Sequence, residues 1–187
     1  EEMTDYTQVD HLPTHGRRVV FQGVEGAYSF GAMKEFFDDT ITSFHVDTWK
    51  EAMEAITKGE ADYAVLPIEN STAGIVSDIY DLLVEYPHYI VGEQELPVKH
   101  VLMALPGAKV EDIRTVISHP QALAQCRRFL DSNENWKTEE RLNTAAAAKE
   151  VSESGDLTMA AVGSPYAAEH FGLQILKEGI FDARGNT

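Results

Sequence analysis

Short apolar runs alternate along this chain with longer segments in which apolar residues recur every three to four positions. Such runs predict strands, and such segments predict amphipathic helices. Residues 19–22 form an early apolar run, which a glycine-rich turn at residues 23–26 links to a helical pattern over residues 29–38. A strand at residues 42–46 and a helix after Thr48 repeat the order. This alternation predicts parallel strands and an α/β fold.

The first half of the chain is organised around residues 62–74. Residues 63–68 are apolar and predict a buried strand, and the polar residues Glu69, Asn70 and Ser71 follow at once. Open α/β sheets bind ligands at the carboxyl ends of their strands, so these side chains are candidates for a site. A polar turn that binds nothing explains them equally well. Ser29, at the start of its helix, is likewise either a capping residue or a ligand-facing hydroxyl.

The second half repeats the alternation after an extended segment. Residues 89–104 are too long for one ordinary strand, so we expect two strands joined where the chain crosses between lobes. Strands are then predicted at residues 115–117, 137–141 and 159–162, and helices follow them. Residues 175–180 are predicted to return toward the first lobe.

We therefore expect two α/β lobes joined by a double crossover, with a cleft between them. Residues 17–96 with 177–187 form the first lobe, and residues 97–176 the second. Residues 1–16 have no steady period and predict a linker or tail.

Composition narrows the classes of function. The 187 residues carry a formal net charge of −16, which argues against a nucleic-acid partner. No apolar run approaches the ~18 residues of a membrane span, and the seven histidines show no metal-ligand spacing. The single cysteine, Cys126, excludes an internal disulfide and is predicted to be a core thiol. We expect a cytoplasmic protein without metal or cofactor.

Five motifs follow one another along the chain: GVEGAYS at residues 23–29, ADYAVLPIENS at 61–71, SHPQALAQC at 118–126, TAAAA at 144–148 and GLQIL at 172–176. Together they resemble the catalytic domain of the prephenate dehydratase family, over about residues 18–186. The resemblance implies a fold similar to type II periplasmic binding proteins, with the active site between two lobes. It also implies decarboxylation of prephenate with loss of its ring hydroxyl, giving phenylpyruvate in phenylalanine biosynthesis.

The resemblance also implies roles for individual residues. Substrate-binding roles fall on Ser29, Asn70, Ser71, Ser118, Gln125 and Thr144. Glu69 is the carboxylate within these motifs; if the cleft desolvates it, a raised pKa would let it donate a proton, and otherwise it caps a turn or forms an ion pair. His119, before Pro120, is predicted to fix a turn.

The family pattern ends in Asn, one variable residue and then Thr-Arg-Phe, whose threonine is catalytic. This sequence ends at Gly185-Asn186-Thr187, so Thr187 is either the variable residue or the catalytic threonine of a shortened pattern. If the catalytic threonine lies beyond the end, this chain lacks the donor to the leaving hydroxyl.

The resemblance implies further partners for the full-length protein. We expect a homo-oligomer, with phenylalanine as a feedback effector acting through a regulatory module that this sequence lacks. The residues before Arg17 are interpreted as a linker remnant from a chorismate mutase domain. The alternative interpretation is a two-lobed module that binds a small carboxylate without catalysis; it would accompany an export signal or a DNA-binding helix pair, and neither is seen.

Overall fold

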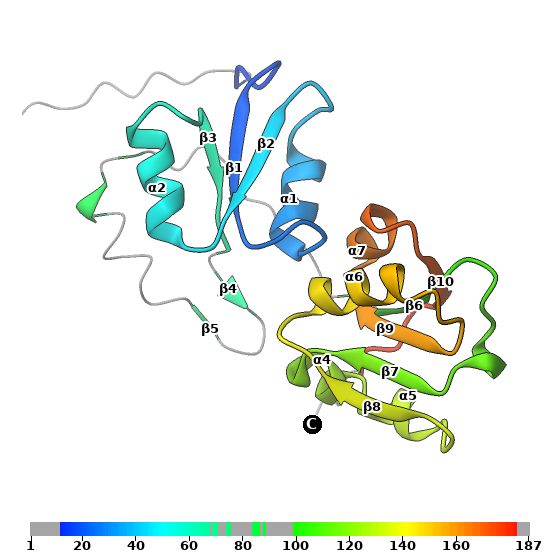
Figure 1. The fold of residues 1–187 in the computed structure, drawn as a ribbon. Helices are drawn as coiled ribbons and strands as arrows, with labels where there is room; N and C mark the ends of the chain where they lie inside the picture. The colour runs from blue at the N-terminus through cyan, green and yellow to red at the C-terminus, as the bar shows by residue number, and fades with distance from the viewer. Residues whose placement is uncertain are drawn as a thin grey trace, which may run out of the picture.

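The computed structural model describes residues 12–67, 69–70, 74–75, 84–86, 88 and 99–182. Figure 1 shows two lobes, each built on its own sheet with helices on both faces. This arrangement confirms the predicted α/β fold with two lobes. Residues 89–98, which contain the predicted first crossover, and residues 183–187 lie outside the described residues. Within the described ranges, no helix has the length and apolar composition needed to cross a bilayer.

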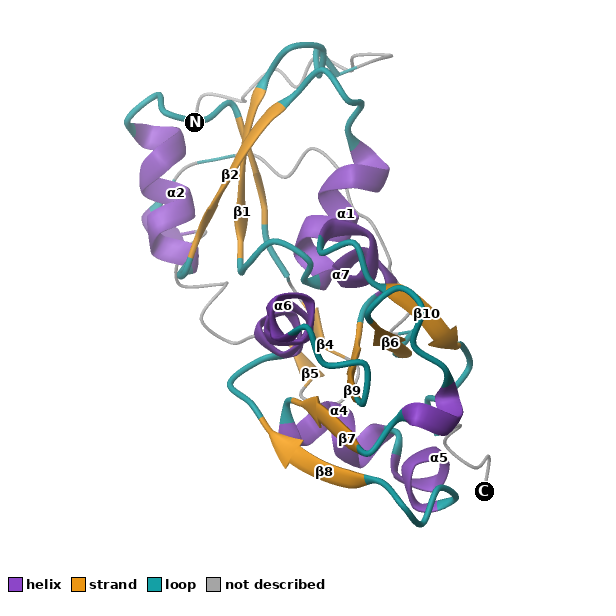
Figure 2. Ribbon diagram, turned by 45° about the vertical axis from the view of Figure 1, so that its right-hand side comes forward, coloured by secondary structure: helices purple, strands orange, loops and turns teal. Residues whose placement is uncertain are grey.

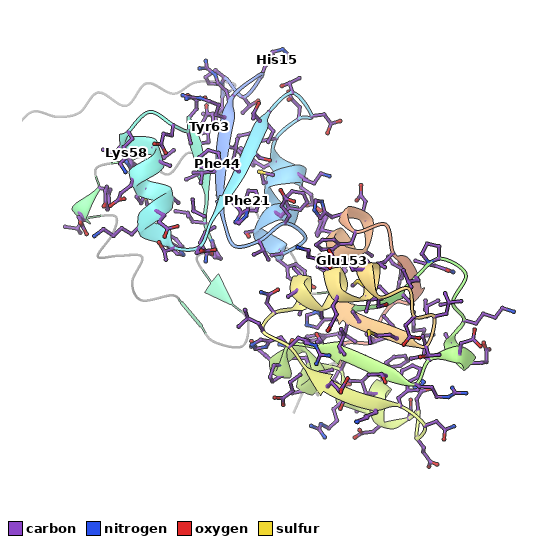
Figure 3. The ribbon with its side chains drawn as sticks, in the orientation of Figure 1. His15, Phe21, Phe44, Lys58, Tyr63 and Glu153 are labelled. Atoms are coloured by element: carbon purple, nitrogen blue, oxygen red, sulfur yellow. The ribbon has the colours of Figure 1, made fainter. Side chains whose placement is uncertain are left out.

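The first lobe contains a parallel sheet in the order β2-β1-β3. Its strands are β1 (Arg18–Gln22), β2 (Thr42–Val46) and β3 (Tyr63–Val65). Helix α1 (Tyr28–Phe36) covers one face of this sheet and α2 (Trp49–Thr57) covers the other (Figure 1). Figure 3 shows Phe21, Phe44 and Tyr63 projecting from the three strands.

The central strand β1 divides its side chains between the two faces. Val19 and Phe21 pack with the α1 residues Phe30 and Met33, whereas Val20 packs with Ala52 and other α2 residues. The division follows from the two-residue repeat of a strand. Strand β3 was predicted to be longer and buried, but it lies at the edge of the described sheet and is half-buried.

A short antiparallel pair follows the first sheet. Strands β4 (Glu69–Asn70) and β5 (Gly74–Ile75) pair with each other, with Asn70 opposite Gly74. Figures 1 and 2 both draw β4 and β5 on the side of the first sheet toward the second lobe. Most of the helix predicted at residues 76–84 lies outside the described residues.

The second lobe contains a five-stranded sheet in the order β10-β6-β9-β7-β8. Its strands are β6 (Val101–Ala104), β7 (Thr115–Ser118), β8 (Lys137–Glu140), β9 (Met159–Gly163) and β10 (Gln174–Lys177). Strands β7, β8 and β9 are parallel, whereas β6 runs antiparallel to both β9 and β10. The parallel set follows the βα alternation, and β6 and β10 close the other edge.

Helices cover both faces of this second sheet. They are α4 (Pro120–Gln125), α5 (Arg127–Asp131), α6 (Thr144–Ser154) and α7 (Pro165–His170), and the 3₁₀ turn η1 (Val110–Asp112) precedes β7. Val116 of β7 points to the core formed with α4 and α5, and its neighbour Ile117 points to the core formed with α6 and α7. The strand is therefore apolar on both faces, as expected of a covered parallel strand.

The prediction that the chain returns to the first lobe from residue 177 is wrong for residues 177–182. Lys177 pairs with Leu102 of β6, and Ile180 is buried in the core of the second lobe. The backbone N–H of Asp182 donates to the carbonyl of Gln125 at 2.7 Å. Antiparallel pairing with β6 thus holds this segment in the second lobe.

Helices α1 and α7 bring the two lobes into contact (Figure 2). A Cβ placed on Gly31 of α1 would overlap the ring of Tyr166, so the glycine permits the close approach of α7. His170 Nε2 lies 2.8 Å from Glu25 Oε2, and its ring packs edge-on against Phe30 at 5.4 Å between centroids. Polar and apolar contacts therefore join the lobes.

Candidate active site

The parallel strands of the second lobe end in polar turns at one edge of the sheet. Strands β7 and β9 lead into α4 and α7, and β8 leads into α6 (Figure 2). A side chain caps each of these helices. His119 Nδ1 accepts from the N–H of Gln121 at 3.0 Å, Asn143 Oδ1 from that of Ala146 at 2.6 Å, and Ser164 Oγ from that of Tyr166 at 2.9 Å. The prediction that His119 fixes its turn is confirmed.

Ser118, the last residue of β7, is fully buried at 0% exposure. Its hydroxyl donates to the carbonyl of Val162 in β9 at 2.6 Å. The proton of Ser118 is therefore used within the protein to tie two strands together just before their helices begin.

Ser29 lies in the first turn of α1 in the first lobe. Its Oγ donates to the carbonyl of Gln22 at 2.6 Å, and the N-cap of α1 is Ala27, which makes no side-chain capping bond. The capping interpretation of Ser29 is therefore wrong. Its hydroxyl instead anchors the helix start to the end of β1.

Thr144 is the first residue of α6 and is half-buried. A Cβ on Gly163 would lie 3.2 Å from the Cβ of Thr144, a tight contact, so glycine at the end of β9 favours the close approach of this helix start to the sheet. The first N–H groups of a helix lack partners within it and favour a negative charge nearby. In a chain with net charge −16, such local donors are what could hold an anion.

Gln125 ends α4 and is half-buried. Its side-chain Oε1 lies 2.7 Å from Nε2 of His100, and its carbonyl accepts from the N–H of Asp182. Both the side chain and the backbone carbonyl of Gln125 are therefore hydrogen-bonded, at the side of the second lobe where β6 begins.

The structure leaves four of the proposed site residues without described side chains. Glu69 and Asn70 lie in β4, but the structure describes only their backbone pairing. Ser71 and Thr187 lie outside the described residues. The roles of these four residues stay predictions.

His100 is a candidate site residue that the sequence did not indicate. It is only 4% exposed, and it lies between Tyr28 of the first lobe and Gln125 of the second. Burial lowers its pKa below the ordinary value of 6.5, although the hydrogen bond with Gln125 opposes this shift. Its partners are 72 and 25 residues away in sequence. The one local signal was a histidine that opens an otherwise apolar run.

A pocket of about 360 Å³ lies beside His100. It is lined by Lys99, His100, Val101, Pro165, Glu178, Gly179 and Phe181. The ring of Phe181 lies 5.8 Å from that of His100, between centroids, and is tilted by 48° against it, so an aromatic ring and the imidazole adjoin in the pocket lining. Lys99 contributes a cationic and Glu178 an anionic side chain to the pocket lining.

Neither metal nor thiol chemistry is indicated at this edge. Within the described ranges, no group of three or more His, Cys, Asp or Glu side chains is placed to hold a metal ion. Cys126 is 0% exposed, as predicted for a core thiol, and burial raises the pKa of its thiol to about 12. The chemistry visible at this edge is hydrogen bonding by hydroxyl, amide and imidazole groups.

Comparison with known sequences identifies relatives over nearly the whole chain. The family model described as prephenate dehydratase matches residues 19–187. Arogenate dehydratase 1 of Petunia hybrida is 43% identical over 184 residues, which are 97% of this chain and 43% of that protein. A bifunctional chorismate mutase/prephenate dehydratase of Escherichia coli K12 is 36% identical over 182 residues, which are 95% of this chain and 47% of that protein. The chain thus spans less than half the length of these two relatives.

Solved structures agree with this result. A prephenate dehydratase from Arthrobacter aurescens, in complex with L-Phe, has a TM-score of 0.75 and 31% identity, covering 89% of this chain and 56% of its own. A protein described as a novel type of quorum-quenching acylase, GqqA, has a TM-score of 0.80 and 38% identity, covering 89% and 60%. Because the family model spans residues 19–187 and includes every turn described above, the chain belongs to the prephenate dehydratase family.

Proposed function

We propose that this chain catalyses the decarboxylating dehydration of prephenate to phenylpyruvate. The observation that carries the proposal is the family match over residues 19–187. The matched residues include Gln125 and its hydrogen-bond partner His100. In the reaction, the bond from the ring to its carboxylate breaks, and the electron pair enters the ring. The ring hydroxyl leaves, and a proton supplied to it completes water. Aromatisation drives the reaction, so the protein must orient the substrate and donate a proton.

The substrate carries two carboxylates, and the site must supply hydrogen-bond donors for them. Gln125, which ends α4, and Thr144, which begins α6, are proposed to donate from the second lobe. Asn70 and Ser71 are proposed to bind from the first lobe. Glu69 or a threonine at or just after Thr187 is proposed as the proton donor. Such a donor typically contributes about 10²–10⁴-fold in rate.

The names of the relatives make arogenate a second substrate to test. Arogenate carries an amino group where prephenate carries its keto oxygen, so it would yield phenylalanine directly. The acylase activity ascribed to GqqA would need a nucleophile. Cys126 is buried with a raised pKa, and Ser118 donates its proton to a carbonyl, so neither side chain suits that role.

The regulation and the cellular location of the full-length protein are further proposals. The L-Phe complex of the Arthrobacter protein supports phenylalanine as a feedback effector of the full-length protein. Homo-oligomerisation and a location in the cytoplasm stay predictions from the sequence.

Gln125→Glu tests the site. This change keeps an oxygen for His100 but replaces the donating amide with a carboxylate, so we expect kcat/KM for prephenate to fall about 10²–10³-fold, the typical effect of losing one oriented donor. Gln174→Glu is a matched control, because Gln174 is exposed on β10 and its Oε1 accepts from the N–H of Gly107 at 3.2 Å. Equal activity in the two variants would remove Gln125 from the site.

A further inference from the structure

His100 connects the two lobes through a chain of hydrogen bonds. The Tyr28 hydroxyl lies 3.4 Å from Nδ1 of His100, and Nε2 of His100 lies 2.7 Å from Oε1 of Gln125. Tyr28 follows the glycine turn after β1, and Gln125 ends α4. The imidazole is therefore within hydrogen-bond distance of one residue of each lobe.

The hydrogen-bond partners of the Tyr28 hydroxyl determine which atom donates between Tyr28 and His100. Within the described ranges, the hydrogen-bond partner of the Tyr28 hydroxyl is Nδ1 of His100, at 3.4 Å. The hydroxyl proton is then left for Nδ1 of His100. If Nδ1 of His100 instead donated to the Tyr28 oxygen, the hydroxyl proton of Tyr28 would have no acceptor among the described residues.

The tautomer of His100 fixes the amide of Gln125. A neutral imidazole that accepts at Nδ1 carries its proton on Nε2, so it donates to Gln125 and can only face the amide oxygen. The NH₂ group of Gln125 then points away from His100. Within the described ranges, no residue accepts a hydrogen bond from this NH₂ group.

We propose that His100 is a positioning residue that presents the NH₂ group of Gln125 as a hydrogen-bond donor to a carboxylate of the substrate, and that Tyr28 sets the tautomer of His100. The inference rests on the proposed function, because it names what orients a group of that site. Without the Tyr28 proton, His100 could adopt the other tautomer and accept from Gln125. The amide would then turn its oxygen toward the substrate and repel a carboxylate.

The tautomer can be measured directly by long-range ¹H–¹⁵N correlation on the labelled chain, with His100→Gln used to assign the signals. We expect the proton of neutral His100 on Nε2, and a shift toward the Nδ1–H form in Tyr28→Phe. A proton on Nδ1 in the unmodified chain would overturn the proposal. This measurement needs no substrate, so its result is independent of whether the proposed function holds.

Substrate affinity supplies the second measurement, by calorimetric titration with prephenate. We expect Tyr28→Phe to weaken binding by about five- to ten-fold, the typical effect of one hydrogen bond. Tyr63→Phe is the matched control, since Tyr63 donates to the carbonyl of Pro13 at 3.1 Å in the first lobe. Equal affinities of the two variants would contradict the role of Tyr28. Absence of any binding of prephenate or arogenate by the unmodified chain would instead count against the proposed function.

Discussion

At the scale of single residues, burial determines the chemistry of Cys126. The thiol packs in the core between α4, α5 and the second sheet. Burial raises its pKa to about 12, and the charge of Asp182 acts in the same direction. Because the thiolate is the reactive form, the native protein should be nearly inert to thiol reagents at neutral pH.

We expect Cys126 to react with an aromatic disulfide reagent at pH 7.5 at least about 100-fold more slowly in the native chain than in the chain unfolded in urea, since reaction requires opening of the core. Cys126 is the one cysteine of the sequence, so the absorbance change reports it alone. Similar rates in the two states would show that the core around α4 is open.

Residues whose role depends on their immediate neighbours were predictable, and those with distant partners were not. His119 was correctly assigned to a turn because Pro120 follows it. The role of Ser29 was left open between a cap and a ligand, but the carbonyl of Gln22 takes its proton. His100 was missed because Tyr28 and Gln125 reach it only after the chain has folded.

At the scale of elements, the contact between α1 and α7 depends on Gly31. A methyl group there would overlap the Tyr166 ring, so we expect Gly31→Ala to destabilise the chain by about 1–3 kcal/mol through overpacking. Helix propensity alone would stabilise it by about 1 kcal/mol, because alanine is the better helix former. Urea unfolding therefore distinguishes the two effects by sign.

The control removes the obstructing ring. In a Tyr166→Ala background, Gly31→Ala should be neutral or slightly stabilising, because only the propensity effect remains. If the substitution costs the same free energy in both backgrounds, the destabilisation does not arise from contact with Tyr166.

Strong local patterns also predicted most elements of the fold. Residues 42–46 form β2 as predicted, and the oxygen of Thr48 accepts from the N–H of Glu51 at the start of α2. The partner of β10 was not predictable in this way. An apolar run does not reveal which sheet it joins, and the pairing of β10 with β6 joins residues about seventy positions apart. The same lack of long-range information caused the wrong lobe assignment of residues 177–182.

At the scale of the whole molecule, His100 should make stability depend on pH. Its pKa is lowered in the folded chain, so the unfolded chain binds more protons near and below pH 6.5. The contribution of His100 to stability is thus complete above pH 6.5. It is lost as pH falls from there toward the lowered pKa of the folded state.

We expect the free energy of unfolding in urea to fall more steeply between pH 7.5 and pH 5 for the unmodified chain than for His100→Gln, which has no titrating group at this position. The comparison uses the slope with pH, so any constant loss of stability in the variant cancels. Parallel curves would show that His100 titrates alike in both states.

The most direct test of the proposed activity is the formation of phenylpyruvate from prephenate. It should be measured for the 187-residue chain and for the same chain carrying Thr-Arg-Phe after Thr187, which completes the family pattern. We predict phenylpyruvate above the spontaneous rate, faster with the added motif by up to about 10²–10⁴-fold if its threonine is the donor. Tight binding of prephenate with no product from either form, and none from arogenate, would contradict the proposed activity and support a non-catalytic carboxylate-binding module.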